Sequence, residues 1–331
     1  MAEGILLVGG YGKRLRPLTN VRPKPMLPIA PLPVTEHQLA MAKKAGLTRI
    51  VLATAYLSDV FTPYFGDGSK WDIEIHYAHE KEPLGTGGAI RNALEYLDGD
   101  REIVIFNGDL LTLHNLKSQL AFHQSNSADV TLHLRTVEDA RAFGCVPIDS
   151  NGRVTAFLEK MENPISNMIN AGCYVFNKEI IETIPINKAV SVEREVFPEL
   201  IAQNKKVMGY FENAYWLDIG TPTTLMQGSQ DLVKGIADGT ALDKYKFAHR
   251  SADFISMSQD ITGVISGGSA IGAYCRLINC NIDASIISDG VEAENCTISN
   301  SFVEIGAKLP TGSHIENAYV DPDGEISPYP K

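Results

Sequence analysis

An apolar residue recurs every five or six positions in the C-terminal part of the chain, and this repeat limits the possible folds more than any other feature. The repeating residues are Ile265, Ile271, Leu277, Ile282, Ile287, Ala293, Ile298, Val303, Leu309 and Ile315. A period near six is typical of a parallel β-helix, whose stacked coils each point apolar residues inward. The alternative is an irregular β-sandwich, but its strands would alternate with a period of two. We therefore predict a parallel β-helix over residues 257–331.

A different pattern extends from the N-terminus to about residue 230, where short apolar runs alternate with longer amphipathic stretches. The runs are residues 5–8, 50–53, 73–77, 103–106, 130–134 and 172–176, and the helix-like stretches include 35–45, 89–96 and 113–123. This alternation predicts an α/β domain with a mostly parallel sheet covered on both faces. Ligands of such sheets bind beyond the carboxyl ends of the strands. We assign residues 1–231 to this domain and residues 232–256 to a connector.

Positive charge is concentrated near the N-terminus of a chain whose formal net charge is −11. No Asp or Glu occurs between Gly4 and Thr35, whereas the cations Lys13, Arg14, Arg16, Arg22 and Lys24 all lie there. The overall acidity argues against nonspecific binding to nucleic acid or to an anionic membrane, which require a broad positive field. A local cluster suits a small anionic ligand better, although each cation alone could be a solvated surface residue.

The five cysteines and the lengths of the apolar runs indicate the cellular compartment in which the protein is found. No C-x-x-C pair and no histidine at zinc spacing accompanies the cysteines, and Cys275, Cys280 and Cys296 fall among small and apolar residues. We interpret them as buried thiols of a reducing compartment. The run 5-ILLV-8 is too short for a signal peptide, and no run is long enough to span a bilayer. We expect a soluble cytoplasmic protein that binds no membrane.

The glycine-rich stretch after the first apolar run has the properties of a phosphate-binding turn. It lacks the third glycine of a dinucleotide-binding turn and the Ser or Thr of a P-loop. Gly9, Gly10 and Gly12 can nevertheless bring backbone N–H groups close to a phosphate. Arg14 can hold two phosphate oxygens, and Lys24, between two prolines, supplies a fixed point charge.

Seven motifs, in order, then identify the family that the chain resembles. They are 8-VGGYGKRLRPLT-19 with 24-KPMLPI-29, 82-EPLGTGGAI-90, 107-NGDL-110, 144-GCV-146, 157-FLEK-160, 170-NAGCYVF-176 and 216-WLDIGTP-222. Together they resemble the sugar-1-phosphate nucleotidyltransferases, and 191-SVEREVFPEL-200 is most similar to the mannose-1-phosphate guanylyltransferases among them. The resemblance implies a Rossmann-like mixed sheet domain followed by a left-handed parallel β-helix.

The resemblance also implies a reaction, in which a sugar phosphate oxygen attacks the α-phosphorus of a nucleoside triphosphate and pyrophosphate leaves. Because the nucleophile is already ionised, catalysis should consist of positioning and charge neutralisation. The implied catalytic residues are Arg14, Lys24, Asp109, Lys160 and Asp218. The implied nucleotide-binding residues are Leu7, Gly9, Gly10, Gly12, Lys13, Arg14, Lys24, Glu80, Gly85 and Asp109. The implied sugar-phosphate-binding residues are Gly144, Glu159, Lys160, Asn170 and Asp218.

Two carboxylates are the candidate ligands of a Mg²⁺ cofactor. Asp109 follows the apolar run 103–106 through Asn107-Gly108, and Asp218 precedes Ile219-Gly220. Mg²⁺ prefers oxygen ligands and commonly takes one or two carboxylates beside phosphates and water. From its spacing alone Asp109 could instead cap a turn.

Glu80 gives a reason, independent of overall likeness, to favour GTP. An ionised carboxylate only accepts hydrogen bonds, and guanine presents two adjacent donors. Uracil and thymine present one donor between acceptors, which would leave the carboxylate partly unpaired. The alternative is that Glu80 points to solvent.

The sequence also allows two rival functions. One keeps the chemistry but uses UTP, dTTP or ATP with glucose 1-phosphate, since mannose and glucose differ in one hydroxyl. The other is a regulatory subunit that binds a nucleotide sugar without catalysis.

Two residues depart from the family pattern: Lys13 stands where the family usually has Thr, and Met161 stands where it usually has Pro. We expect the β-helix to serve assembly of a homo-oligomer.

Overall fold

The computed structural model describes residues 2–10, 12–55, 58–99 and 102–329, and these form two compact units. The first unit comprises Met1–Gly10 and Gln38–Trp216, and the second comprises Tyr11–His37 and Leu217–Lys331. The glycine-rich N-terminal loop therefore groups with the C-terminal part of the chain. The linear boundaries expected at residues 231 and 256 do not coincide with these units, and they stay a prediction.

A mixed β-sheet forms the centre of the first unit. Its strands are β1 (Glu3–Leu7), β4 (Arg49–Thr54), β5 (Glu74–His79), β6 (Glu102–Asn107), β8 (Val130–Thr136), β9 (Gly144–Cys145), β10 (Leu158–Glu159), β11 (Met168–Asn177) and β12 (Val207–Phe211). β6, β1, β4 and β5 run parallel, as the buried apolar runs predict. β11 is antiparallel to both β6 and β8. The mixed α/β sheet predicted from the sequence is confirmed.

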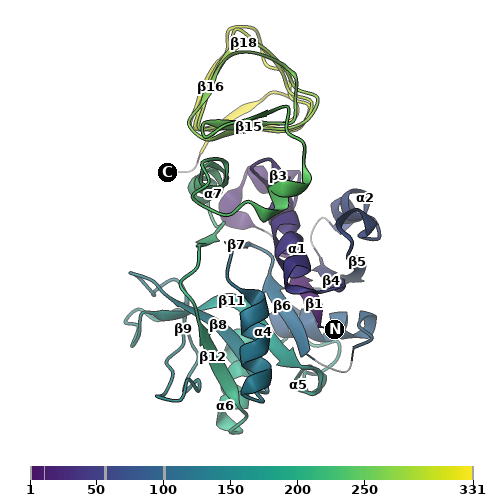
Figure 1. Cartoon of the computed structure of the whole chain (residues 1–331), viewed down its shortest axis with the longest axis vertical. Coiled ribbons are helices and arrows are strands. Elements are labelled where there is room, and N and C mark those ends of the chain that lie inside the picture. The colour runs from purple at the N-terminus through teal and green to yellow at the C-terminus, as the bar shows by residue number, and fades with distance from the viewer. Residues whose placement is uncertain (1, 11, 56–57, 100–101, 330–331) are drawn as a thin grey trace. The chain divides into compact units, whose positions relative to one another are not determined.

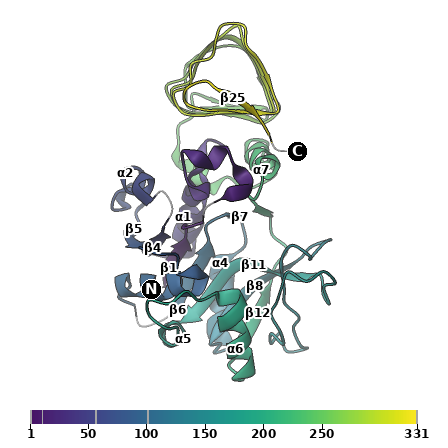
Figure 2. The same ribbon diagram turned by 180° about the vertical axis from the view of Figure 1, so that it is seen from behind.

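Helices cover both faces of this sheet, as the amphipathic stretches predict. The helices of the first unit are α2 (Phe61–Phe65), α3 (Gly85–Ala93), α4 (Leu116–Ser125), α5 (Lys178–Glu182) and α6 (Phe197–Ala202). α4 packs on β8, β11 and β12 and lies in front of the sheet in Figure 1, whereas α6 lies in front of it in the reverse view of Figure 2. The core between the sheet and its helices includes the fully buried Ile5, Ile105 and Phe197.

Short elements shape the N-terminal loop of the second unit. The 3₁₀ helices Lys13–Leu15 and Lys24–Met26 and the hairpin of β2 (Pro28–Ile29) with β3 (Leu32–Pro33) follow each other along this loop. Helix α7 (Pro222–Val233) packs against β2 and also against β17 (Ser269–Ile271). α1 (Val34–Ala45) and β13 (Trp216–Asp218) have residues in both units.

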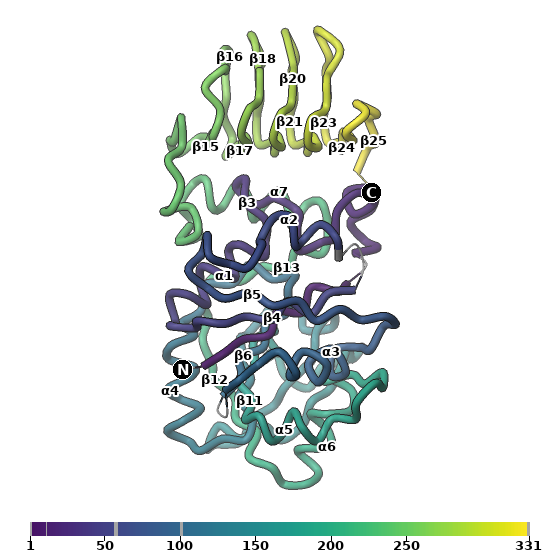
Figure 3. Tube along the Cα trace, turned by 90° about the vertical axis from the view of Figure 1, so that its right-hand side faces the viewer, coloured from purple at the N-terminus to yellow at the C-terminus, as the bar shows by residue number. Residues whose placement is uncertain are grey.

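The C-terminal strands stack as successive coils of a solenoid. They are β14 (His249–Arg250), β15 (Phe254–Ser256), β16 (Asp260–Ser266), β17 (Ser269–Ile271), β18 (Arg276–Asp283), β19 (Ile286–Ile287), β20 (Glu292–Glu294), β21 (Thr297–Ser299), β22 (Phe302–Val303), β23 (His314–Glu316), β24 (Ala318–Val320) and β25 (Ile326–Pro328). β15, β17, β19, β22 and β24 pair in parallel, and β16, β18, β21 and β23 do the same. Figure 1 looks down this stack, and Figure 3 shows its coils side by side.

The register of the coils explains the apolar repeat in the sequence. Ile271 pairs with Ile287 and Ile287 with Val303, so each of these coils advances by 16 residues, in steps of five or six. The repeating residues form one core cluster, with Ile265 partly buried at its margin. Burying such a branched side chain contributes roughly 1.5–3 kcal/mol. The parallel stack is thus as predicted, whereas its left-handed sense stays a prediction.

The burial of the cysteines agrees with the sequence. All five cysteines are buried and free, including Cys275, Cys280 and Cys296. In the part of the chain that the structure describes, no helix has both the length and the apolar character of a membrane span.

Candidate active site

The loop that carries the cations is held in shape by its own backbone. Gly12 has a left-handed conformation with φ of 59°, and an added Cβ would lie 2.8 Å from Thr19 Cγ2. The Gly12 carbonyl accepts hydrogen bonds from Leu15 N–H at 2.9 Å and from the Thr19 hydroxyl at 3.0 Å. Glycine is therefore required at this position for conformation as well as for space.

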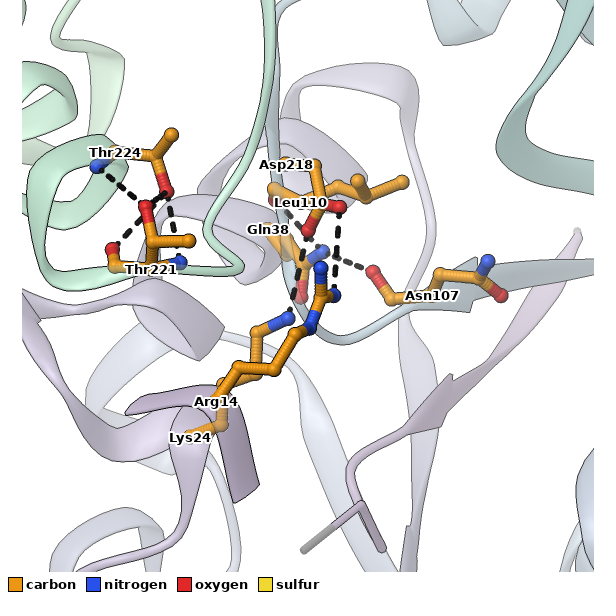
Figure 4. A network of polar contacts seen from close by, with 8 residues as sticks. All are labelled: Arg14, Lys24, Gln38, Asn107, Leu110, Asp218, Thr221 and Thr224. Atoms are coloured by element: carbon orange, nitrogen blue, oxygen red, sulfur yellow. Dashed lines mark hydrogen bonds and ion pairs between the residues drawn. The ribbon is translucent and has the colours of Figure 1, made fainter. Parts of the chain in front are cut away.

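Two of the predicted cations meet a predicted carboxylate in the second unit. Lys24 Nζ lies 3.5 Å from Asp218 Oδ1, and Arg14 Nη2 lies 4.0 Å from Asp218 Oδ2. Figure 4 shows both side chains directed at Asp218. The Lys24 side chain is only 9 % exposed, whereas that of Arg14 is 72 % exposed. Lys24 is thus a fixed charge within the fold, and Arg14 reaches solvent where a ligand could displace it from Asp218.

The residues after Asp218 support this ion cluster. An added Cβ on Gly220 would lie 3.1 Å from Arg14 Nη2, so the guanidinium packs directly on the glycine backbone. Thr221 then caps α7: its hydroxyl accepts the Thr224 N–H at 3.2 Å, and Thr224 Oγ1 accepts the Thr221 N–H at 3.1 Å. This reciprocal capping box, also visible in Figure 4, fixes the start of the helix directly after residues 218–220.

Asp109 lies on a constrained turn of the first unit, between β6 and β7 (Leu110–Thr112). The side chain of buried Gln38 donates to the backbone oxygens of Asn107 at 2.7 Å and Leu110 at 3.0 Å, and so closes this turn (Figure 4). An added Cβ on Gly108 would lie 2.4 Å from Leu7 O, and Gly108 N–H donates to that oxygen at 3.0 Å. The turn that carries Asp109 is therefore fixed from both sides.

Glu80 and Gly85 lie at the turn predicted to face the base. Glu80 Oε2 accepts the Leu84 N–H at 2.9 Å, so one of its oxygens closes the turn. Partial burial raises the pKa of the Glu80 carboxyl, and the hydrogen bond from Leu84 opposes that rise. Gly85 has φ of 67°, and a Cβ there would lie 2.6 Å from Val190 O. Glu80 is therefore half-buried and oriented, and it does not simply point into solvent.

Hydrogen bonds join the first turn of α3 to the segment 190–193. The Gly87 N–H donates to Val190 O at 2.8 Å. Thr86 Oγ1 donates to Glu193 Oε2 at 2.7 Å and accepts the Val192 N–H at 2.9 Å. The 191–200 motif therefore has a structural task in the first unit, since it anchors the glycines of the 82–90 motif.

Three of the residues predicted to bind the sugar phosphate lie on two adjoining strands or directly after them. Gly144 of β9 is the register partner of Glu159 of β10. A Cβ on Gly144 would lie 2.8 Å from the Phe157 ring and 3.0 Å from Glu159 Oε2, so the bare glycine backbone packs against this carboxylate, whose side chain is 20 % exposed. Lys160 follows with φ of 51°, an exposed side chain and its Nζ 3.6 Å from Glu159 Oε1.

Asn170 lies where the pairing of β11 with β8 shifts register. Its Oδ1 accepts the Gly172 N–H at 3.0 Å, and its Nδ2 donates to Tyr174 Oη at 2.8 Å. Asn107 Nδ2 lies 3.5 Å from the same oxygen. The fully buried Tyr174 thus links Asn170 to the strand that leads to Asp109.

The remaining predicted residues lie at the end of β1 and on the segment that follows it in the sequence. β1 ends at Leu7, and Gly9 and Gly10 follow it. A Cβ on Gly9 would lie 3.1 Å from Ala55 Cβ, whereas a Cβ on Gly10 would have no neighbouring atom within 4 Å. Lys13 is exposed.

Among the described residues, no group of three or more His, Cys, Asp or Glu side chains is arranged to hold a metal ion. Asp109 and Asp218 belong to different units, so their pairing as ligands stays a prediction.

Comparison with known proteins relates this arrangement to one family. The model of the family described as "Nucleotidyl transferase" matches residues 3–235. A mannose-1-phosphate guanylyltransferase of Mycobacterium tuberculosis is 46 % identical over 89 % of this chain and 82 % of its own length. The catalytic subunit beta of a mannose-1-phosphate guanylyltransferase of Drosophila melanogaster is 35 % identical, and the match covers 68 % of this chain and 61 % of that protein.

A solved structure gives the same relationship for the fold. HddC from Yersinia pseudotuberculosis, complexed with GMP-PN, has a TM-score of 0.60 and 28 % identity to this chain. The match covers 70 % of this chain and 100 % of that one.

Proposed function

The chain belongs to the nucleotidyl transferase family, and from this premise we propose that it transfers a nucleotidyl group from a nucleoside triphosphate to a hexose 1-phosphate, releasing pyrophosphate. GTP and mannose 1-phosphate are the favoured substrates, because two relatives named for that reaction match most of this chain. The observation that carries the proposal is the convergence of Arg14 and Lys24 on Asp218. A buried lysine and an exposed arginine that both approach Asp218 suit two anionic reactants that repel each other.

Lys24 and Arg14 have different roles because one side chain is buried and the other is exposed. Lys24 is held among buried residues, so it presents its charge without reorganisation when negative charge develops on the α-phosphate. Arg14 is exposed and has a planar fork of donors, so it can move from Asp218 to hold two oxygens of the triphosphate. Gly12 and the exposed Lys13 supply a backbone N–H and a further charge on the same loop.

The sugar phosphate is assigned to the residues of the first unit that adjoin Glu159. Glu159 accepts hydrogen bonds from sugar hydroxyls over the bare Cα of Gly144, and Lys160 pairs with the phosphate. Asn170 offers a further polar contact to the sugar, and Tyr174 holds its amide in place. The exposed Lys160 reaches outward from a strained backbone position, as a residue that meets a ligand would.

Base selection is assigned to the turn of Glu80 and Gly85. Glu80 Oε2 is used by the Leu84 N–H, and the carboxylate has a second oxygen with which to accept from guanine. Gly10 exposes its backbone after the end of β1, beside Leu7 and Gly9, and we assign the approach of a flat base or a ribose to these residues.

The residues present fit a magnesium ion as cofactor. Asp109 lies on a constrained turn and Asp218 is the last residue of β13. Both carboxylates are partly exposed, and Mg²⁺ needs few protein ligands when phosphates fill its other positions. Bound there, the ion would neutralise charge on the phosphates and hold them in line. Gln38 and Gly108 keep the Asp109 carboxylate at one place during this binding.

The cellular setting follows from the same family. We place the protein in the cytoplasm, where nucleoside triphosphates and sugar phosphates are available, with small molecules rather than nucleic acid or membranes as partners. The regular outer faces of the β-helix are the surfaces on which copies of the chain would associate into a homo-oligomer.

A pyrophosphate-release assay tests the proposal. Purified protein is incubated with Mg²⁺ and each combination of GTP, ATP, UTP or dTTP with mannose 1-phosphate or glucose 1-phosphate. We expect the highest kcat/KM for GTP with mannose 1-phosphate. Absence of release with every combination would refute the enzymatic assignment, and a preference for another pair would refute only the substrate choice.

A further inference from the structure

Arg22 connects the loop of Lys24 to the β-helix. Arg22 lies two residues before Lys24, between two 3₁₀ helices of the loop. Its Nη1 donates to the Met26 backbone oxygen at 3.5 Å, so the guanidinium spans the turn that carries Lys24. Its Nη2 forms an ion pair with Glu304 Oε1. One side chain thus holds the lysine's turn and contacts a carboxylate from the other end of the chain.

Glu304 is fixed by the coil that carries it. It directly follows β22, and its side chain is completely buried. Its N–H donates to Val320 O at 2.9 Å, and Oε1 also accepts the Ile305 N–H at 2.9 Å. Burial raises the pKa of the Glu304 carboxyl, and the Arg22 charge opposes that rise. The carboxylate therefore cannot shift without disturbing its coil.

The solenoid itself does not require an acidic residue at this position. The register of the stack places Ser288 and Gly272 at the equivalent positions of the two preceding coils. Their N–H groups make the same ladder bonds, to Val303 O at 2.9 Å and to Ile287 O at 2.8 Å. A buried charge is unfavourable unless it is paired, and an apolar or small residue is usually as stable there. Glu304 therefore has a task outside the β-helix.

We propose that Glu304 is a positioning residue for Lys24: by holding Arg22, it fixes the segment 22–26 and sets where the lysine presents its charge to the phosphates. This inference rests on the proposed function for its catalytic consequence. The β-helix is then part of the catalytic apparatus as well as a surface for assembly.

Other contacts keep the loop attached when this pair is removed. The Ala30 N–H donates to the buried Ser229 Oγ of α7 at 3.2 Å. α7 in turn packs on β17. Beside this contact, Gly268 precedes β17 and Lys234 follows α7, and a Cβ on Gly268 would lie 2.9 Å from Lys234 Cε. A variant at Glu304 should therefore fold, with the disturbance confined to the segment around Arg22.

The test compares Glu304→Gln with Glu292→Gln. Glu292 makes an exposed ion pair with Lys308 at 2.8 Å on the same β-helix, so its substitution is the matched control. We expect Glu304→Gln to lower kcat by about tenfold or more, since misplacement of a positioning group by 1 Å can cost about 10²-fold. Glu292→Gln should stay within about twofold, as surface substitutions usually do. A folded Glu304→Gln with unchanged kcat would overturn the proposal.

A double-variant cycle separates positioning from general stability. If Glu304 acts through Lys24, Glu304→Gln should cause little further loss of kcat in a Lys24→Met background. A full multiplicative loss in that background would show that Glu304 acts by another route. Thermal unfolding of each variant checks that the fold is retained.

Hydrogen exchange gives a readout that does not depend on activity. The Met26 and Leu27 amides donate to Pro23 O at 2.8 Å and Lys24 O at 3.1 Å, so their protection reports on the lysine's turn. Glu304→Gln should speed their exchange, and Glu292→Gln should not. Unchanged exchange in Glu304→Gln would overturn the proposal, whereas a wild-type protein inactive with every substrate would count against the proposed function alone.

Discussion

Replacing Lys24 by methionine should remove most of the activity while leaving the fold intact. Methionine has a similar length and lacks the charge, and the Lys24 side chain is only 9 % exposed, so the buried position accepts the apolar group. Asp218 keeps Arg14 at 4.0 Å as a counter-charge, so it is not left unpaired. Because this remaining pair is partly exposed, we expect a change in unfolding free energy below about 1 kcal/mol.

The loss of activity should be far larger than the change in stability. Removing one preorganised charge stabiliser typically costs about 10²–10³ in kcat, which corresponds to about 2.7–4 kcal/mol of transition-state stabilisation. We expect Arg14→Ala to cost a similar factor. For Lys24→Met, kcat and kcat/KM should fall together, because the interaction is strongest in the transition state.

Steady-state pyrophosphate release and urea unfolding, measured on the same preparation, test this prediction. A folded Lys24→Met variant with kcat within about fivefold of the wild type would refute the role of Lys24, because a preorganised catalytic charge is worth much more than that. A loss of activity matched by a loss of folded protein would show a structural role instead.

Four further predictions concern the base, the Asp109 turn, the metal and a buried histidine. Glu80→Gln keeps an acceptor for the Leu84 N–H but loses the second acceptor oxygen, so the GTP:UTP ratio of kcat/KM should shift toward UTP; an unchanged ratio would exclude Glu80 as the base reader. Gln38→Leu frees the turn of Asp109 and should lower kcat by about tenfold, whereas full activity would make that clamp dispensable. EDTA should abolish pyrophosphate release and added Mg²⁺ restore it; activity in EDTA would contradict the metal assignment. Burial lowers the pKa of His133 to about 2, so below about pH 6.5 the unfolded chain binds a proton that the folded chain does not. Urea unfolding should therefore show a free energy of unfolding about 2 kcal/mol lower at pH 5 than at pH 7 because of this residue. The variant His133→Gln should remove this loss.

The sequence was most informative where a repeat or a motif is local. The inward residues of the β-helix follow from their spacing alone, since each coil must bury one residue per face. The loop of Lys24 and the carboxylate of Asp218 follow from the family motifs, and the structure brings them together.

Other features required the folded chain, because their partners are distant in sequence. Gln38 is an ordinary helix residue until its amide is seen to close the 107–110 turn. Tyr174 looks like one more apolar residue of a strand, yet its hydroxyl accepts hydrogen bonds from Asn170 and Asn107. Glu304 carries no motif, and its pairing with Arg22 spans 282 positions. The antiparallel pairing of β11 with β6 and β8 likewise joins distant segments, and the apolar runs alone do not predict its direction.

The reaction can be traced most directly with a sugar 1-phosphate labelled with ¹⁸O at its non-bridging phosphate oxygens. If a sugar phosphate oxygen attacks the α-phosphorus of GTP, ³¹P NMR of the product will show every label retained in the GDP-sugar, with one label bridging its two phosphorus atoms. The released pyrophosphate will carry none. Label in pyrophosphate, loss of one label from the sugar nucleotide, or the absence of any sugar nucleotide would contradict the proposed transfer.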